Sequence, residues 1–507
     1  MFSSGNIFRW DFLPILPYTP LVGSFVRIIF FPVLFTVISG CATQADYQRP
    51  LLATQESWSN QDQTLQTIPS QLEVWWKALN DSAVDMLTEA AQADNPTLKQ
   101  AIARVDEAKA NLGINSADKL PTLSANASTL RARNLDGNTS ETSTASSAGL
   151  GFSWELDLFG RVRNSVEIAQ RRLDARTADA QSARLSIAAE VGTNVLALRA
   201  CQFSVSVLTD ELSSRDEILT LTRHRVLAGY VAPIEEARAL TGLASARTSY
   251  ISRREECTQY VNALVALSGW DRNLVMELVS KPLVASNGHA QYAYADSIMP
   301  VAPPSKLAIP ALVLLAHPNV VSSEQELAAA WAEIAVSRAE RLPRLNLAAL
   351  LTGQWLRAAG QTIDFTTWSA GPTLAATLYD GGRGSSNVKA SEARYRLALA
   401  GLNLSLRAAA QDIENALAAI DSAKFRISTT QVSTDAAFRT LVATEAQWRA
   451  GSISMFELED SRRQFSFTQD SAINALRDSG QAWIALVRAS GNSVITLETA
   501  TLENLTP

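Results

Sequence analysis

Apolar side chains recur every three to four positions along Arg161–Ala228, a stretch that contains no proline and a single glycine, Gly192. This spacing is typical of one face of a helix. The stripe consists of Val162, Val166, Ala169, Leu173, Ala180, Ala183, Ile187, Val191 and Leu198. At 1.5 Å per residue such a helix would be roughly 100 Å long. A compact domain cannot bury it, so we expect partner helices along its whole length, and Arg383–Ala450 has the same length and character.

The period changes from about 3.6 to 2 before each long helix. Leu150, Phe152, Trp154, Leu156 and Leu158 alternate with polar or small residues, which is typical of a strand with one apolar face. The same alternation marks residues 123–129, 345–351 and 368–378, and it predicts hairpins over residues 121–160 and 343–382. We expect a polar loop from Asn134 to Ser147 in the first hairpin.

Strands of about ten residues with one apolar face fit a transmembrane barrel, although two half-buried hairpins in a soluble domain would give the same pattern. Four strands cannot enclose a usable lumen, because the smallest membrane barrels have about eight. Open sheet edges cannot face lipid. If the hairpins form a barrel, several copies of the chain must share it.

The chain contains an internal duplication. Five dipeptides that punctuate the pattern recur at one offset of 222 residues (318 − 96, 343 − 121, 383 − 161, 451 − 229 and 491 − 269). The pairs are Asn95-Pro96 with His317-Pro318, Leu120-Pro121 with Leu342-Pro343, Gly160-Arg161 with Gly382-Arg383, Ala228-Gly229 with Ala450-Gly451, and Ser268-Gly269 with Ser490-Gly491. The repeated unit is therefore a helix, a hairpin, a very long helix, a turn and a returning helix.

The duplication divides the chain into six parts. The predicted parts are a signal peptide (1–40), an N-terminal linker and equatorial segment (41–81), a first repeat (82–270), a non-periodic connector (271–310), a second repeat (311–491) and a short polar tail (492–507). In the first repeat the long helix covers 161–228 and the returning helix 233–269. In the second they cover 383–450 and 454–490.

The N-terminus resembles a bacterial lipoprotein signal. Arg27 precedes an apolar run that is too short to cross a bilayer comfortably and that Pro32 interrupts, and Ile38-Ser39-Gly40-Cys41 follows. This pattern predicts cleavage before Cys41 and acylation of its thiol. An ordinary signal peptide that happens to end near a cysteine is the alternative. A lipid on one cysteine only tethers a protein to a membrane.

Composition narrows the function classes. The 507 residues are 47% hydrophobic and 19% charged, with a formal net charge of −6 and three histidines. This balance gives no sign of nucleic-acid binding and argues against a histidine-based metal or catalytic site. Acidic pairs lie on helix surfaces, where solvated charge is the default. Gly381–Gly384 is glycine-rich but lacks the Lys-Ser/Thr of a phosphate-binding loop. We therefore expect no enzyme activity, no metal and no cofactor apart from the lipid.

In its order of motifs the sequence resembles the TolC-like outer-membrane factors, and specifically their acylated branch, the NodT-type efflux lipoproteins. The resemblance covers nearly all of the mature chain. It is carried by Cys41, Trp75-Trp76, the run from Leu87 through Asn95-Pro96 to Ala108, Leu120-Pro121, Trp154–Arg161, Tyr379–Arg383 and the two glycine turns.

The resemblance implies an α+β membrane protein, a homotrimer in the bacterial outer membrane. Each chain would give four strands to a 12-stranded transmembrane β-barrel and its helices to a periplasmic coiled-coil tunnel. The implied function is a passive exit duct that joins a periplasmic adaptor protein and an inner-membrane pump. Drugs, metal ions, organic solvents and secreted peptides leave through such ducts. The alternative is a periplasmic coiled-coil adaptor or scaffold lipoprotein without a pore.

The resemblance also implies two sets of functional residues near the helix turns. By position after Gly451, an aperture set would comprise Phe456, Asp460 and Arg463, with Glu235 and Arg238 at the equivalent site of the first repeat. A solvated helix face is the alternative, because charges are dense there. Adaptor contacts would fall on Gly229, Tyr230, Gly451 and Ser452.

Cys201 and Cys257 flank the turn at Gly229–Pro233 at similar distances along the chain. Antiparallel helices joined there would place the two residues within about one helical turn of each other. Spacing alone does not fix which helix faces meet, and a disulfide needs Cα atoms within about 7 Å. We expect two separate buried thiols rather than a bridge.

Overall fold

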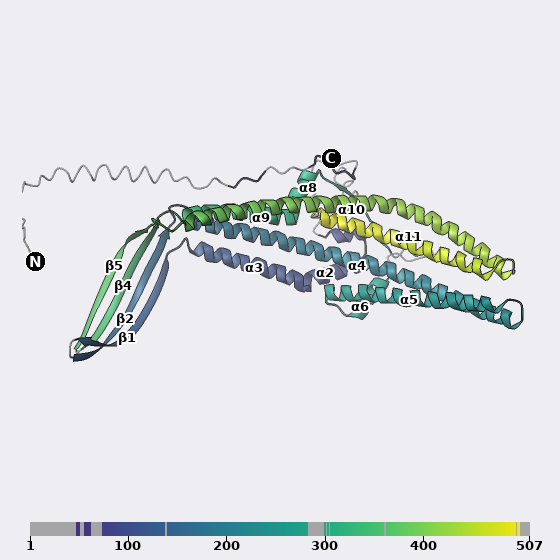
Figure 1. Ribbon diagram of the computed structural model, residues 1–507, viewed down its shortest axis with the longest axis horizontal. Helices are drawn as coiled ribbons and strands as arrows, with labels where there is room; N and C mark the ends of the chain where they lie inside the picture. The colour runs from purple at the N-terminus through teal and green to yellow at the C-terminus, as the bar shows by residue number, and fades with distance from the viewer. Residues whose placement is uncertain are drawn as a thin grey trace, which may run out of the picture.

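The computed structural model shows an elongated chain with four long strands at one end and paired helices along the rest of its length (Figure 1). The two helix turns lie together at the end opposite the strands. The described residues are 47–50, 55–61, 74–136, 139–281, 299–300, 302–303, 305–358, 361–492 and 494–496. The predicted signal peptide and Cys41 lie outside these ranges.

Both repeats fold into the same succession of elements. The first contains η1 (Trp75–Leu79), α2 (Ser82–Asp94), α3 (Pro96–Ala117), β1 (Thr122–Asp136), β2 (Thr139–Leu156), α4 (Arg161–Leu227) and α5 (Pro233–Ser268). The second contains α8 (Pro310–Ala316), α9 (Pro318–Ala339), β4 (Arg344–Ala358), β5 (Gln361–Ala375), α10 (Arg383–Arg449) and α11 (Met455–Ala489). Between and after them lie α6 (Arg272–Ser280), β3 (Ser305–Leu307) and β6 (Val494–Thr496).

The helix breaks fall at the residues that the sequence marks. The Asn95 side chain accepts a hydrogen bond from the Thr97 amide at 2.9 Å, and Pro96 opens α3 where its missing N–H costs nothing. His317 takes the same capping position for α9, its Nδ1 accepting from the Asn319 amide at 3.1 Å. Each repeat therefore ends one helix and starts the next with the same device.

The four long strands form one antiparallel sheet in the order β1-β2-β4-β5. Its register places Leu150 beside Leu351, and Leu351 beside Trp368. This shared apolar face matches the predicted alternation. Trp368 is 78% exposed within the single chain. In the described part of the chain, the outer edges of β1 and β5 pair with no further strand.

The strands are longer than predicted, 15 to 18 residues. The predicted loop from Asn134 to Ser147 is wrong, because β1 continues to Asp136 and β2 starts at Thr139. The Ser and Thr residues in this stretch pair across the ladder instead, as Ser128 does with Ser147 through hydroxyls 2.9 Å apart. The polar residues indicated exposure to solvent. Exposed residues occur in strands as well as in loops, so polarity alone did not identify a loop.

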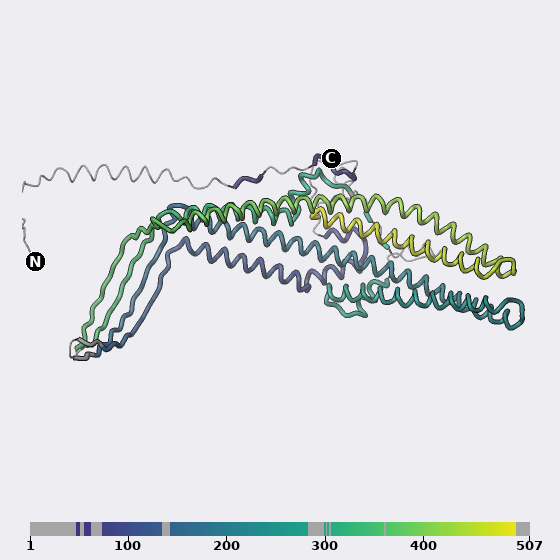
Figure 2. Tube along the Cα trace, viewed as in Figure 1, coloured from purple at the N-terminus to yellow at the C-terminus, as the bar shows by residue number. Residues whose placement is uncertain are grey.

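The long helices lie in one layer with two open edges. Near the sheet the order is α3–α4–α9–α10, and near the turns it is α5–α4–α11–α10, as the backbone trace shows (Figure 2). α4 also contains a segment long and apolar enough to cross a bilayer, but 61% of that segment is buried within the chain. It is a core helix of the layer.

The connector and the tail meet at the middle of the layer. The connector is not wholly irregular as predicted, since it contains α6 and β3. The predicted polar tail includes β6, which pairs antiparallel with β3. Isolated three-residue strands carry no periodicity, so this pairing has no local signal in the sequence. Trp75 and Trp76 are each 3% exposed in the same region, and the ring centroids of Trp75 and Trp483 lie 5.7 Å apart.

Candidate functional site

The two turns at the end of the helix layer share one backbone geometry. Gly229 and Gly451 both have φ of +75°, a left-handed conformation that glycine adopts without strain. The amide of Tyr230 donates to the Arg225 carbonyl at 2.8 Å, and Ser452 closes the second turn in the same way at 3.0 Å. Both turns therefore close in the same way, and Tyr230, 82% exposed, projects from the first.

A small apolar core directly beneath the turns joins the two helical hairpins of the chain. Its buried members are Ile218, Leu219, Ala239, Leu243, Trp448, Met455 and Leu458. The Arg225 guanidinium lies 4.7 Å from the centroid of the Trp448 ring, a cation–π contact between α4 and α10. The capping box of Ser454 and Glu457 starts α11 at this core. The two turns are thus held at one height.

The three predicted aperture residues of α11 lie on one exposed face of the helix. Phe456, Asp460 and Arg463 follow each other at spacings of four and three, and the Phe456 side chain is 63% exposed. Phe467, 66% exposed, continues this face four residues further on. Sequence reasoning missed Phe467, although its spacing from Arg463 is a helical signal.

The charges of the aperture set pair within their own helices. Asp460 binds Arg463 on α11, and Glu235 binds Arg238 on α5 at 2.8 Å. Within the single chain, Arg238 does not contact Asp460. Residues three apart on a helix are direct neighbours. These pairs therefore do not connect the hairpins.

Other polar residues connect α11 to the first hairpin. Arg215 of α4 binds Glu459, the residue before Asp460, and the pair passes over Gly242 of α5. A Cβ at Gly242 would lie 2.6 Å from the Arg215 guanidinium, so a larger residue there would push that guanidinium aside. Both partners are at least four-fifths buried. The sequence did not single out Arg215 or Glu459, because charge alone does not show which helix face meets a neighbour.

Three further contacts extend this line of polar contacts away from the turns. Glu211 accepts from the Ser466 hydroxyl at 2.9 Å. Asp470 accepts from the Ser204 hydroxyl at 2.7 Å and lies 3.2 Å from Arg253. We call the seven residues of this line the hairpin seam: Ser204, Glu211, Arg215 and Arg253 on the first hairpin, and Glu459, Ser466 and Asp470 on α11.

Cys201 and Cys257 form a disulfide between α4 and α5, with Cα atoms 5.6 Å apart. The expectation of two separate buried thiols is therefore wrong. Cys201 is 3% exposed, whereas Cys257 is only partly buried. Their similar distances from the turn brought the residues to nearly one height, and the facing of the two helices brought their side chains together.

Residues of the N-terminal segment contact the helix layer and the connector. The Arg49 guanidinium makes a two-point contact with the carboxylate of Glu324 on α9. Burial, together with the nearby charge of Glu324, raises the pKa of Tyr47 to about 12. Further along, the Trp58 indole donates to the Ala308 carbonyl at 2.8 Å. The chain is thus fixed to the protein soon after the predicted lipid attachment site.

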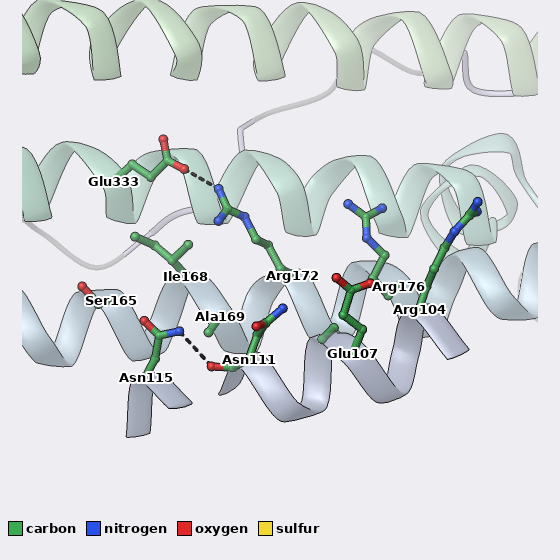
Figure 3. A pocket seen from close by; sticks show the side chains of 11 residues that line it. Arg104, Glu107, Asn111, Asn115, Ser165, Ile168, Ala169, Arg172, Arg176 and Glu333 are labelled. Atoms are coloured by element: carbon green, nitrogen blue, oxygen red, sulfur yellow. Dashed lines mark hydrogen bonds and ion pairs between the residues drawn. The ribbon is translucent and has the colours of Figure 1, made fainter. Parts of the chain in front are cut away.

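A polar groove of about 760 Å³ lies between α3 and α4 (Figure 3). Arg104 and Glu107 of α3 face Arg172 and Arg176 of α4, and Arg172 reaches Glu333 on α9 at 2.5 Å. At 100° per residue, Glu333 lies about 180° around α9 from Glu324. The groove and the N-terminal segment therefore lie on opposite sides of the helix layer. In the described residues, no group of three or more His, Cys, Asp or Glu is placed to hold a metal ion.

The match to a family of known proteins follows the duplication. The model of the family described as outer membrane efflux protein matches residues 87–270 and 309–492. The two matches are offset by 222 residues (309 − 87 and 492 − 270). Together they cover more than half of the chain, once for each repeat.

Individual relatives align over nearly the whole chain. Nodulation protein T of Rhizobium leguminosarum bv. viciae is 27% identical over 450 residues, 88% of this chain and 89% of its own. Outer membrane protein OprJ of Pseudomonas aeruginosa is 26% identical over 464 residues, 90% and 93%. The solved structure of the Campylobacter jejuni CmeC outer membrane channel superposes with a TM-score of 0.77 at 21% identity, covering 92% and 98%.

Four strands with a shared apolar face, continued by a layer of very long helices, define a subunit of an outer-membrane channel. The chain belongs to the outer membrane efflux protein family. The predicted fold class is that of the family, and the protein is an outer-membrane efflux channel with a periplasmic helical part. The alternative of a pore-free adaptor finds no support among the relatives.

Proposed function

We propose that three copies of this chain form a passive exit duct, which an adaptor protein connects to an inner-membrane pump. One observation carries the proposal: the sheet and the helix layer have open edges on the same two sides. β1 and α3 form one edge, and β5 and α10 form the other. Lipid cannot satisfy an open sheet edge, so β5 of one copy pairs with β1 of the next until the ring closes.

The helix edges support the same closure. On α10, Leu397, Leu404, Phe425 and Val432 are each at least 63% exposed in the single chain. They are separated by multiples of seven residues, the spacing of a coiled-coil contact. Exposed apolar stripes of this length mark an interface. The next copy supplies α3 near the sheet and α5 near the turns.

The turns are the proposed adaptor contact. These four residues lie at the end of the layer opposite the sheet, on two turns of the same geometry above one apolar core: Gly229, Tyr230, Gly451 and Ser452. A threefold ring would present six such turns to an adaptor. The junction at Gly381 and Gly382, both with positive φ, is a tight strand-to-helix turn rather than a phosphate-binding loop. We therefore propose that the pump supplies the energy, and that this chain contributes no enzyme activity.

The hairpin seam and the aperture set are the proposed gate. Phe456, Asp460 and Arg463 face away from the core of their own chain, as residues around a shared axis must. The seam holds α11 against the first hairpin through Arg215–Glu459. Three copies of Asp460 near one axis would attract cations, because like charges in a narrow mouth raise the negative potential.

The lipid anchor on Cys41 agrees with the position of the N-terminal segment. Cys41 lies six positions before Tyr47, and this stretch spans at most about 20 Å. From Glu324 to the last residue of α9, Ala339, the helix rises about 22 Å towards the sheet. A chain fixed at Tyr47 and Arg49 can therefore carry Cys41 most of the way to the sheet end of α9. A lipid-anchored segment would lie on the outside of the proposed ring, and the groove of Figure 3, on the opposite side of the layer, would then face the lumen.

Conductance tests the proposed duct. Purified protein should run as a heat-resistant trimer on a gel and open ion-conducting channels in a planar bilayer. The cognate adaptor, which we propose binds at the turns, should change the conductance when it is added. A monomer that binds membranes without conducting would overturn the proposal.

A further inference from the structure

α5 is held to α4 by very few buried side chains in its middle part. Ala246 and Val261 are buried, and none of the fourteen residues between them is. α11, the corresponding helix of the second repeat, has buried side chains distributed along its whole length. Since burial of apolar surface is the main force between packed helices, the middle of α5 is the least firmly packed part of the two hairpins.

The two hairpins are cross-linked by different chemistry. α10 and α11 are joined by Arg426–Asp478 at 2.8 Å and by Glu445–Arg462 at 2.6 Å. Between α4 and α5, Arg223 and Glu236 form an exposed pair near the turn. Cys257 lies within the weakly packed stretch, and its disulfide to Cys201 supplies the link there.

The duplication shows that this link is specific to one hairpin. The positions equivalent to Cys201 and Cys257 are Ala423 and Ser479 (201 + 222 and 257 + 222). Ala423 is fully buried, as expected where α10 and α11 pack closely against each other. The second hairpin thus reaches the same fold without a covalent bond. The disulfide therefore compensates for weak helix packing that occurs only in the first hairpin.

Firm attachment of α5 to α4 matters because α5 lies at the open edge of the layer. Near the turns the edge helices are α5 and α10. α10 exposes Phe425 and Val432 on its free face. A neighbouring copy must place its α5 against these side chains, so the α5 surface has to be ordered before the copies meet.

We propose that oxidation of Cys201 and Cys257 is an assembly step, in which the disulfide fixes α5 on α4 in the position that receives α10 of the next copy. The inference rests on the proposed trimer. Each thiol loses its proton, and the pair gives up two electrons to the disulfide of a periplasmic thiol oxidant, which is released as a dithiol. The periplasm permits this chemistry.

The two cysteines differ in accessibility: Cys201 is 3% exposed in the folded chain, whereas Cys257 is only partly buried. Thiol–disulfide exchange needs access to the attacked sulfur, so the oxidant reacts first at Cys257.

The test compares trimers with and without the bond. We expect a thiol reductant to lower the melting temperature of the wild-type trimer by about 5 °C or more, a shift of the size that disulfide loss gives. Cys201→Ala/Cys257→Ala should melt at the lower temperature with or without reductant, and should give less trimer and more monomer in the outer membrane. Cys257→Ser alone should behave like the double variant.

The double variant serves as the control for any effect of the reductant on other parts of the protein. The inference is overturned if reduced and oxidised trimers melt at the same temperature with the same yield. It is also overturned if the native protein labels at two free thiols without reductant. If oxidised wild-type protein forms no trimer at all, the proposed duct fails instead.

Discussion

Arg199 and Asp81 form a two-point ion pair inside the protein, with both nitrogen–oxygen distances at 2.8 Å and side chains 2% and 0% exposed. Arg199 also donates to the carbonyls of Val279 and Lys281. Asp81 additionally caps α2 through the Ala83 amide. The pair therefore ties α4 to α2 and to the end of α6.

Removal of one partner should destabilise the chain strongly. Asp81→Ala leaves a buried guanidinium without its counter-ion, which typically costs about 3–5 kcal/mol of unfolding free energy. Denaturant unfolding of the trimer measures this loss. Arg172→Ala is the control, because its pair with Glu333 is half exposed and such pairs are worth about 0–1 kcal/mol. Equal losses in the two variants would contradict the structural role of the buried pair.

The hairpin seam should determine how easily the duct opens. Glu459→Gln removes the charge that Arg215 binds, so we expect more frequent openings in single-channel recordings. Gly242→Ala should act in the same direction, because the new methyl group displaces the Arg215 guanidinium. Glu457→Gln, in the capping box and outside the seam, is the matched control. A Glu459→Gln channel with wild-type open probability would show that the seam does not gate.

Asp460 and Arg463 should set ion selectivity more than they hold the closed state. Their pair lies within one helix and is exposed, so each substitution should shift gating modestly. Asp460→Ala should lower the preference for cations, because three carboxylates leave the mouth of the duct together. Reversal potentials in a salt gradient measure this change. If Asp460→Ala, Arg463→Ala and the double variant all match wild type, the two residues belong to an ordinary solvated face.

Stability at the middle of the helix layer should fall in acid through His317. Burial lowers the pKa of His317 below its ordinary value, and Asp412 opposes this only in part. The folded protein therefore favours the neutral ring, whose Nδ1 caps α9. That contribution is complete above the ordinary pKa of about 6.5, and it is lost as the pH falls through 6.5 towards the lowered value.

The first repeat supplies the matched variant for His317. Asn95 performs the same capping task without titrating in this range. His317→Asn should therefore lose less melting temperature between pH 7.5 and pH 5.5 than wild type does. Asp412 and Arg488, which line a cavity beside His317, stay unchanged in the comparison. A parallel loss in both proteins would place the acid sensitivity elsewhere.

The lipid on Cys41 should affect attachment more than channel formation. Cys41→Ser should leave the mature chain without acyl groups, as mass spectrometry of the N-terminus would show, and should weaken membrane association during biogenesis. The barrel strands are unchanged, so trimers that do form should conduct normally. An unmodified N-terminus at another residue in the wild-type protein would remove the basis of this prediction.

The internal repeat made most of the fold readable from the sequence. Asn95-Pro96 and His317-Pro318 mark helix starts through local capping chemistry, and Gly229 and Gly451 mark turns through positive φ. Leu150, Leu351 and Trp368 share a face because a strand alternates strictly. Each of these signals acts within a few residues, so no tertiary information is needed to find it.

The functional contacts between helices were readable only in part. The exposed face of Phe456, Asp460 and Arg463 follows from spacing along α11, and the structure adds Phe467 to it. The ion pair between Arg215 and Glu459 joins residues 244 positions apart, and it passes close over Gly242 of a third helix. A sequence rich in Arg and Glu offers many such pairs, and only the crossing of three helices selects one.

Local periodicity thus determined the elements, their order and their duplication, because helix caps, glycine turns and strand alternation are fixed by neighbouring residues. The tertiary structure alone decided that Cys201 and Cys257 face each other, that Asp460 pairs within its helix while Glu459 reaches Arg215, and that β3 meets β6. Each of these depends on how one helix or strand is rotated against another. That rotation minimises the exposed apolar surface of the whole layer, a quantity that no single segment contains.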